Sequence, residues 1–132
     1  FIRDRISQSF NQHGTWFQFV IISLDSGKII GDIGVHFWDS ENKQAGLCYT
    51  LNRQFHHKGF AREALTEVLN LLFNKYQKHR VIASVDPANI NSVKLLERLS
   101  FRKEAHFRES IFVNGVWADD AQYAILKKEW LS

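Results

Sequence analysis

The first half of the chain alternates short apolar runs with polar turns. The runs are rich in aromatic and β-branched residues, which predicts β-strands. Polar turns over 25–28 and 39–43 separate them, and the first of these turns predicts a β-hairpin. The predicted strands cover residues 15–23, 29–38 and 45–51. Residues 1–14 mix polar and apolar positions and are interpreted as the remnant of a short helix.

Helical periodicity appears in the middle of the chain. Apolar residues recur at intervals of three and four from Ala61 to Tyr76, which predicts a helix. A run over 80–86 predicts a strand, and Pro87 ends it. A second, shorter helix is predicted over 91–99.

The remaining pattern completes the predicted fold. Asn89 and Asn91 are both suitable N-caps for the short helix. Asn114 and Gly115 stand between two strand-like runs, which is a strong signal for a two-residue hairpin. The order β-β-β-α-β-α-β-β places one parallel pair among antiparallel hairpins. The prediction is an α/β (α+β) fold with a mixed, mostly antiparallel sheet, in a single domain over residues 1–132.

Composition narrows the class of protein. The chain has 132 residues, 45% hydrophobic and 23% charged, which is ordinary for a soluble domain. The net charge of +3 comes from interleaved basic and acidic residues, which disfavours nucleic acid as a partner. No apolar run reaches the ~18 residues of a membrane span, and no signal peptide is visible. Cys48 is the single cysteine, so no internal disulfide forms, and a cytoplasmic location is expected.

The stretch FHHKGFAREAL, residues 55–65, brings cations and a glycine to the start of the predicted helix. The first helical N–H groups have no intrahelical partners, and the helix dipole adds roughly half a positive charge. Gly59 permits backbone conformations in which several N–H groups converge on one phosphate. Lys58 and Arg62 add mobile positive charge. A pyrophosphate fits this arrangement, although glycine is also common at a plain helix start.

Metal and nucleic acid are the competing interpretations of this stretch. His56 and His57 are adjacent and point in different directions, and no cluster of cysteines or carboxylates lies near them in the sequence, which disfavours a metal. Nucleic acid requires a broader basic stripe.

Two segments carry a family resemblance. YTLNRQFHHKGFAREAL (49–65) precedes VDPANINSVKLLERLSF (85–101). A Q/R-x-x-G-x-G/A signature falls on residues 56–61, with His56 in place of Gln or Arg. An N-x-x-S/A region ending in G-F falls on Asn89, Ser92 and 100–101, with Ser100 in place of the glycine. Both resemble the GNAT superfamily of N-acetyltransferases, most closely its ribosomal-protein N-terminal (alanine/serine) acetyltransferase group.

The resemblance covers about residues 17–130. It implies the acyl-CoA N-acyltransferase fold, with a splayed central parallel pair and helices on both faces of the sheet. We expect the first strand and helix of that fold to be largely missing or reduced before Phe1, where the chain begins without Met.

The resemblance also implies acetyl-coenzyme A as the acetyl donor, without a metal. The backbone N–H groups of residues 57–61 would hold the pyrophosphate, and the strands of Tyr49 and Val85 would splay to admit the pantetheine arm. Lys94 could reach the phosphate on the adenosine, and the alternative is that Lys94 lies on a solvated helix face. The implied cofactor-binding residues are Leu51, Asn52, His56, His57, Lys58, Gly59, Phe60, Ala61, Arg62, Asn89, Ser92 and Lys94.

The implied reaction is direct acetyl transfer to a primary amine, either a protein N-terminal α-amine or a small molecule. A backbone N–H near Tyr49 or Thr50 would serve the oxyanion. Ser92 is the candidate acid, because the tyrosine that many relatives use falls on Leu96. An ordinary hydroxyl in the first turn of a helix is the alternative for Ser92.

His36 is the first candidate for the general base, because histidine is the side chain most often used for proton transfer near neutral pH. The period-two pattern places His36 on one strand face with Asp32 and Trp38. A satisfied strand histidine is the alternative, and His106 and Glu109 are the next candidates. Tyr49 is the third catalytic candidate, as a residue that positions the substrate, with core packing as its alternative.

Two other functions stay open. Departures from the family pattern at Leu96 and Ser100 favour a coenzyme A-binding module with weak or no turnover. A basic nucleic-acid-binding α/β domain is more remote. A homodimer is left open.

Overall fold

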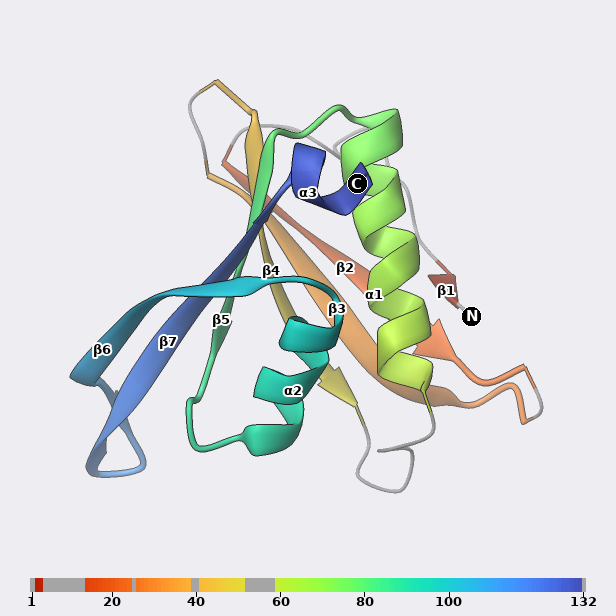
Figure 1. Cartoon of the computed structure of the whole chain (residues 1–132). Helices are drawn as coiled ribbons and strands as arrows, with labels where there is room; N and C mark the ends of the chain where they lie inside the picture. The colour runs from red at the N-terminus through yellow and green to blue at the C-terminus, as the bar shows by residue number, and fades with distance from the viewer. Residues whose placement is uncertain (1, 4–13, 25, 39–40, 52–58, 132) are drawn as a thin grey trace.

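One mixed β-sheet forms the frame of the molecule (Figure 1). This computed structural model describes residues 2–3, 14–24, 26–38, 41–51 and 59–131. Within these ranges, seven strands lie in the order β1-β2-β3-β4-β5-β7-β6, in which β4 and β5 are parallel and the other neighbours antiparallel. The predicted mixed, mostly antiparallel sheet is therefore confirmed. The strands are β1 (Ile2–Arg3), β2 (Thr15–Ile22), β3 (Ile29–Phe37), β4 (Gln44–Leu51), β5 (Arg80–Val85), β6 (Arg102–Val113) and β7 (Val116–Leu126).

The described helices lie on one face of this sheet (Figure 1). Trp130 Nε1 on α3 donates to Asn70 Oδ1 on α1 at 2.9 Å, and the Tyr49 hydroxyl on β4 donates to the Ser92 carbonyl on α2 at 3.4 Å. Helices were expected on both faces, but the second face carries none among the described residues. The helices are α1 (Phe60–Asn70), its π-helical continuation η2 (Leu71–Lys75), α2 (Ile90–Arg98) and α3 (Lys127–Leu131).

The period-two pattern of β3 explains the one-sided core. Ile33, Val35 and Phe37 face the helices and are fully buried, whereas His36, on the other face, is only partly buried. The apolar stripe of α1 and η2 packs onto the same core. Its fully buried members include Leu65, Leu69, Leu72 and Phe73.

Two details correct the predicted elements. Ile2–Arg3 pairs with β2 as a strand, where a helix remnant was predicted, and residues 4–13 lie outside the described part of the chain. Strand β7 ends at Leu126, and Lys127 begins a short helix that the pattern did not reveal. Glu129 explains this helix, because its Oε1 accepts a hydrogen bond from the Leu126 backbone N–H at 2.8 Å, as in a capping box.

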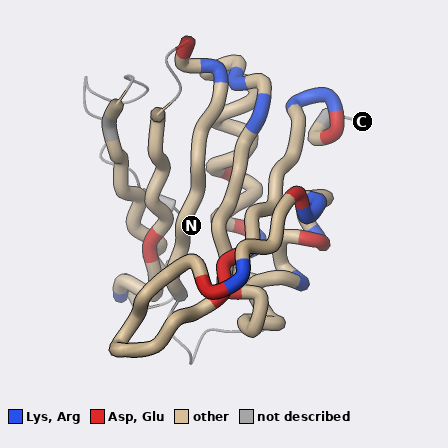
Figure 2. The backbone as a smooth tube through the Cα atoms, turned by 90° about the vertical axis from the view of Figure 1, so that its left-hand side faces the viewer, with Lys and Arg blue, Asp and Glu red and all other residues tan. Residues whose placement is uncertain are grey.

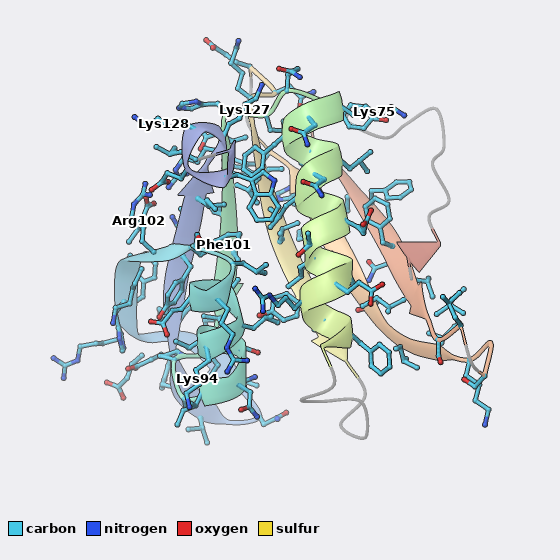
Figure 3. All side chains as sticks on the ribbon, turned by 45° about the vertical axis from the view of Figure 1, so that its right-hand side comes forward. Lys75, Lys94, Phe101, Arg102, Lys127 and Lys128 are labelled. Atoms are coloured by element: carbon cyan, nitrogen blue, oxygen red, sulfur yellow. The ribbon has the colours of Figure 1, made fainter. Side chains whose placement is uncertain are left out.

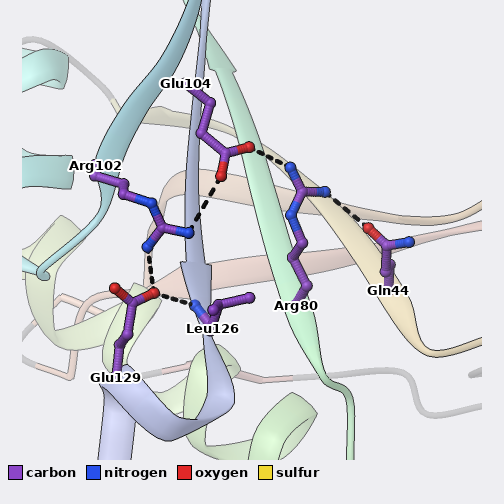
Figure 4. Close-up of polar contacts among 6 residues, drawn as sticks. All are labelled: Gln44, Arg80, Arg102, Glu104, Leu126 and Glu129. Carbon is purple, nitrogen blue, oxygen red and sulfur yellow. Dashed lines mark hydrogen bonds and ion pairs between the residues drawn. The ribbon is translucent and has the colours of Figure 1, made fainter.

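A polar chain ties one end of the parallel pair (Figure 4). Arg80 on β5 donates to Gln44 on β4 at 2.7 Å and also pairs with Glu104 on β6. Glu104 pairs in turn with Arg102, which pairs with Glu129 of α3. The start of β4 is thereby linked through side chains to β5, β6 and α3.

Glu129→Gln is expected to lower the thermal unfolding midpoint at pH 7, because the amide keeps the bond from Leu126 but loses the charge pair with Arg102. The Leu126 N–H, and after it Arg102, hold the pKa of Glu129 below its ordinary value. A lowered carboxyl pKa stabilises the fold above the unfolded pKa of about 4.3, and this stabilisation is lost as pH falls through the folded value.

The difference in unfolding midpoint between the unaltered protein and Glu129→Gln should therefore shrink in acid. Thermal melts at pH 7 and at about pH 3 would measure it. A gap that stays constant across this range would contradict the role given to the Glu129 charge.

Ser100→Gly is expected to raise the free energy of unfolding by about 1 kcal/mol. Ser100 follows α2 with φ of 72°, a left-handed conformation that a Cβ atom disfavours. The helix end imposes it, since Ser100 N donates to the Glu97 carbonyl and Phe101 N to the Leu96 carbonyl. Urea unfolding measures the change. Ser100→Ala keeps the Cβ atom and serves as the control, which should show no such gain.

Candidate functional site

The parallel strands β4 and β5 separate at one end. Their ladder runs from Gln44–Arg80 to Leu47–Ala83. Beyond it, β4 stays paired with β3 as far as Leu51, and β5 stays paired with β7 as far as Val85. Since each strand follows a different neighbour, the sheet opens between them. We call this opening the split, and the predicted splay at Tyr49 and Val85 falls within it.

The start of α1 follows a glycine, which has no side chain of its own to cap the helix. Gly59 is the N-cap, with φ of 80° and ψ of 0°, and makes no side-chain cap. The Glu63 N–H donates to the Gly59 carbonyl at 3.0 Å and closes the first helical turn. A Cβ atom on Gly59 would meet nothing within 4 Å. A left-handed residue without a side chain therefore leads into a helix start that suits an anion.

Several predicted cofactor-binding residues belong to this helix start. Phe60 and Ala61 open α1, and the Arg62 side chain is exposed one residue later. Leu51 is the last residue of β4 and pairs with Gly31 of β3. The predictions for Asn52, His56, His57 and Lys58 lie outside the described residues.

The start of α2 borders the split on the helix-covered face. Asn89 is the N-cap, and its Oδ1 accepts from the Ser92 N–H at 3.3 Å. The Tyr49 hydroxyl reaches the Ser92 carbonyl, so β4 and α2 are joined here. The structure thus brings Tyr49 of the first motif segment together with Asn89 and Ser92 of the second. Lys94 is exposed on α2, near the end of the molecule at which α1 begins (Figure 3).

Burial raises the pKa of the Tyr49 phenol, and the hydrogen bond to Ser92 offsets this only in part. Tyr49 therefore stays protonated at neutral pH and can donate a hydrogen bond but cannot act as a base. Leu96 is fully buried in the core, which agrees with the inference that it takes no part in proton transfer.

A pocket of about 330 Å³ lies on the opposite face, which we call the helix-free face because it carries no helix among the described residues. Cys48 and Ser84 line it, and each directly follows the last pair of the parallel ladder, Leu47–Ala83. The pocket therefore sits where the split begins. Its other lining residues include Trp16, His36, Trp38, Gly46 and Ile82. The sequence pattern indicated His36 but not the pocket around it, because only the strand register brings four strands together at this point.

Stacking fixes the orientation of the His36 ring. The ring centroids of His36 and Trp16 are 4.3 Å apart and their planes differ by 4°. Trp38 follows His36 by two residues, and the centroids of their rings are 6.1 Å apart. The candidate base is therefore held at the pocket wall.

The alternative bases His106 and Glu109 lie on β6, separated from β5 by β7. His106 Nε2 is 2.7 Å from Asp119 Oδ2, and the Glu109 N–H donates to Asp119 Oδ1 at 2.8 Å. The pKa of the Asp119 carboxyl is lowered mainly by His106. These contacts hold an irregular part of the β6–β7 hairpin, with Glu109 at φ of 46°.

Charge on the described part of the chain is mixed in sign. Figure 2 shows Lys and Arg interspersed with Asp and Glu, without a continuous basic stripe. Within the described ranges, no helix has both the length and the apolar character of a membrane span. The same ranges hold no group of three or more His, Cys, Asp or Glu residues placed to share a metal ion.

Comparison with known proteins decides the family. The family model described as "Acetyltransferase (GNAT) domain" matches residues 1–102. The chain belongs to the GNAT acetyltransferase family. The resemblance of its two motifs and the inferred fold are thereby confirmed.

Individual relatives of this GNAT chain differ in what they acetylate. An uncharacterized N-acetyltransferase, p20 of Bacillus licheniformis, is 35% identical over 86% of this chain and 64% of its own length. The crystal structure of ribosomal-protein-S5-alanine acetyltransferase from Vibrio fischeri has a TM-score of 0.80 and 27% identity, over 87% of this chain and 63% of that one. A mutant of spermidine N-acetyltransferase SpeG from Vibrio cholerae has a TM-score of 0.80 and 25% identity, over 89% and 69%. The GNAT chain thus spans about two thirds of the length of these relatives.

Proposed function

We propose that this chain transfers an acetyl group from acetyl-coenzyme A to a primary amine. The observation that carries the proposal is the split, which has a pocket on one face where it begins and is bordered on the other face by the start of α2. The pantetheine arm would enter the split from the helix-covered face and pair with the free edge of β4. The pyrophosphate would rest on the N–H groups from Gly59 to Arg62.

The acceptor would approach from the helix-free face, so that donor and acceptor meet at the split. His36 would take a proton from the ammonium form of the amine, directly or through one water. A backbone N–H of β4 near Tyr49 or Thr50 would donate to the tetrahedral oxyanion. Ser92 would pass a proton to the leaving thiolate and take up in return the second proton that the amine nitrogen loses as the amide forms. The ordinary thiol pKa of about 8.5 makes the thiolate an easy leaving group.

The kind of amine is the finer part of this proposal. Relatives carry the names of enzymes for a ribosomal-protein alanine and for spermidine, so a protein N-terminus and a small molecule are both candidate acceptors. The single domain, the cytoplasmic location, the absence of a metal and the open homodimer stay predictions of the sequence.

A coenzyme A-binding module with weak turnover is the second candidate function. The buried Leu96 and the strained Ser100 favour it, because both depart from the family pattern near the cofactor side. The two candidates share cofactor binding and differ only in turnover.

Two measurements test the proposal. Titration calorimetry is expected to show saturable binding of acetyl-coenzyme A, and absence of binding at millimolar cofactor would refute both candidates. Release of the coenzyme A thiol in the presence of amines, with mass spectrometry of the product, separates them. If the cofactor binds but no peptide or small amine is acetylated, the result would support the coenzyme A-binding module.

A further inference from the structure

We infer that the pocket on the helix-free face, the aromatic pocket, selects an acceptor whose primary amine adjoins a flat apolar group, and disfavours polycationic amines. The inference rests on the proposed function and names the acceptor class. One ring of the acceptor would lie in the pocket while its amine points to the split.

The aromatic walls come from neighbouring strands held in register. Trp16 pairs with His36 across β2 and β3, and the two rings stack. Trp16 remains 62% exposed, so the indole keeps accessible surface for a ligand ring. Offset stacking of a ligand ring on such a surface adds attraction to the burial of apolar area.

Glycine creates the floor of the aromatic pocket. A Cβ atom on Gly46 would lie 3.5 Å from the Trp38 ring and 3.7 Å from Ile82 Cγ1. On Gly34 it would lie 2.9 Å from Cys48 Sγ and 3.6 Å from the Trp16 ring. A side chain at Gly46, which lines the pocket, would occupy space between the aromatic walls. The pocket is thus open in part because Gly46 lacks a side chain.

Charge argues against a polyamine. Among the described residues that line the pocket, none is acidic. Asp32 shares its strand face but lies four residues before His36 and accepts a hydrogen bond from Thr50 Oγ1 at 2.6 Å. Glu104 is engaged by Arg80 and Arg102. An acceptor with several ammonium groups would lose hydration here without gaining a carboxylate partner among the described lining residues.

Size and position set the length of the acceptor. The volume of about 330 Å³ lies at the lower end for ligand pockets, which suits one ring and a short linker. Cys48 and Ser84 line the pocket where the split begins, so the amine of such a molecule would reach the thioester from the ring site. A small aromatic amine and a peptide whose first residue is aromatic both place a primary amine near a flat apolar group.

The test compares three acceptors at equal concentration: 2-phenylethylamine, a short peptide beginning with phenylalanine, and spermidine. We expect at least one of the first two to exceed spermidine in kcat/KM by about tenfold or more, and the better of the two identifies the source. Equal or faster acetylation of spermidine would overturn the inference.

Variants locate the effect. Gly46→Val should lower kcat/KM for the preferred acceptor about tenfold or more by filling the aromatic pocket, and Trp16→Ala should lower it by up to about tenfold. Gly46→Ala adds a methyl group at ordinary contact distance, so it keeps the fold and should act in the same direction. Trp117→Ala, at an exposed tryptophan of the β6–β7 hairpin, is the matched control and should not change the preference. An unaltered preference in Gly46→Val and Trp16→Ala would place the acceptor elsewhere.

A binding measurement separates this inference from the proposed function. Ligand-observed NMR with 2-phenylethylamine, without cofactor, should show saturable binding that Gly46→Val removes. Such binding without acetyl transfer to any amine would support the aromatic pocket and refute the enzyme. Acetyl transfer without a preference for the flat apolar amines would support the enzyme and refute the pocket.

Discussion

Replacing Gly59 with aspartate is expected to weaken acetyl-coenzyme A binding by about 100-fold, because a carboxylate would stand where the proposed pyrophosphate binds. Two like charges about 4 Å apart near a protein surface repel by up to ~4 kcal/mol, and 100-fold corresponds to about 2.7 kcal/mol. Gly59 faces open space, so the new side chain fits without a clash. Titration calorimetry measures the affinity directly.

Gly59→Asn is the matched control, because asparagine has nearly the same shape and both residues tolerate a left-handed backbone. With φ of 80° at this position, the two variants share whatever strain a side chain introduces. Asparagine should therefore retain most of the affinity. Equal affinities for the two variants would show that the pyrophosphate does not bind at this helix start.

Ser92→Ala is expected to lower kcat by about 100-fold while the affinity for acetyl-coenzyme A changes little. Proton transfer by a positioned side chain contributes roughly 10²–10⁴-fold, and Ser92 is the proposed acid. Alanine keeps the backbone N–H that donates to Asn89 and the carbonyl that accepts from the Tyr49 hydroxyl. Steady-state kinetics combined with calorimetry would separate rate from binding.

Ser92→Thr retains a hydroxyl and should keep most of the turnover. An unchanged kcat in Ser92→Ala would leave Ser92 as an ordinary helix residue and favour direct departure of the thiolate. A parallel loss of cofactor affinity would instead assign Ser92 to the binding of the donor.

Local pattern was sufficient for most of the fold. The alternation of Ile33, Val35 and Phe37 with polar neighbours predicted a strand with one buried face, and the structure buries that face fully. The spacing of α1 and the hairpin at Asn114 and Gly115 are equally local signals, and both elements are present. The short helix α3 was missed because Glu129 stabilises it through Leu126 and the distant Arg102.

In the candidate site, too, features that depend on local sequence were predicted and features that depend on packing were not. Gly59 was identified from its own chemistry, since a glycine before a helix predicts a left-handed residue and free N–H groups. The contact between Tyr49 and Ser92 was not predicted, although both residues were named, because it depends on how α2 packs over β4. The aromatic pocket was missed because strand register alone brings Trp16 beside His36.

The tie at Gln44–Arg80 and the end of the ladder at Leu47–Ala83 give β4 two stretches of unequal protection. In deuterated buffer, the backbone amides of β4 that face β5 should exchange slowly before Leu47 and faster between Cys48 and Leu51. A pantetheine arm that lies in the split as an added strand would slow only the second stretch. The isotope pattern along eight residues would then report the bound donor without any turnover.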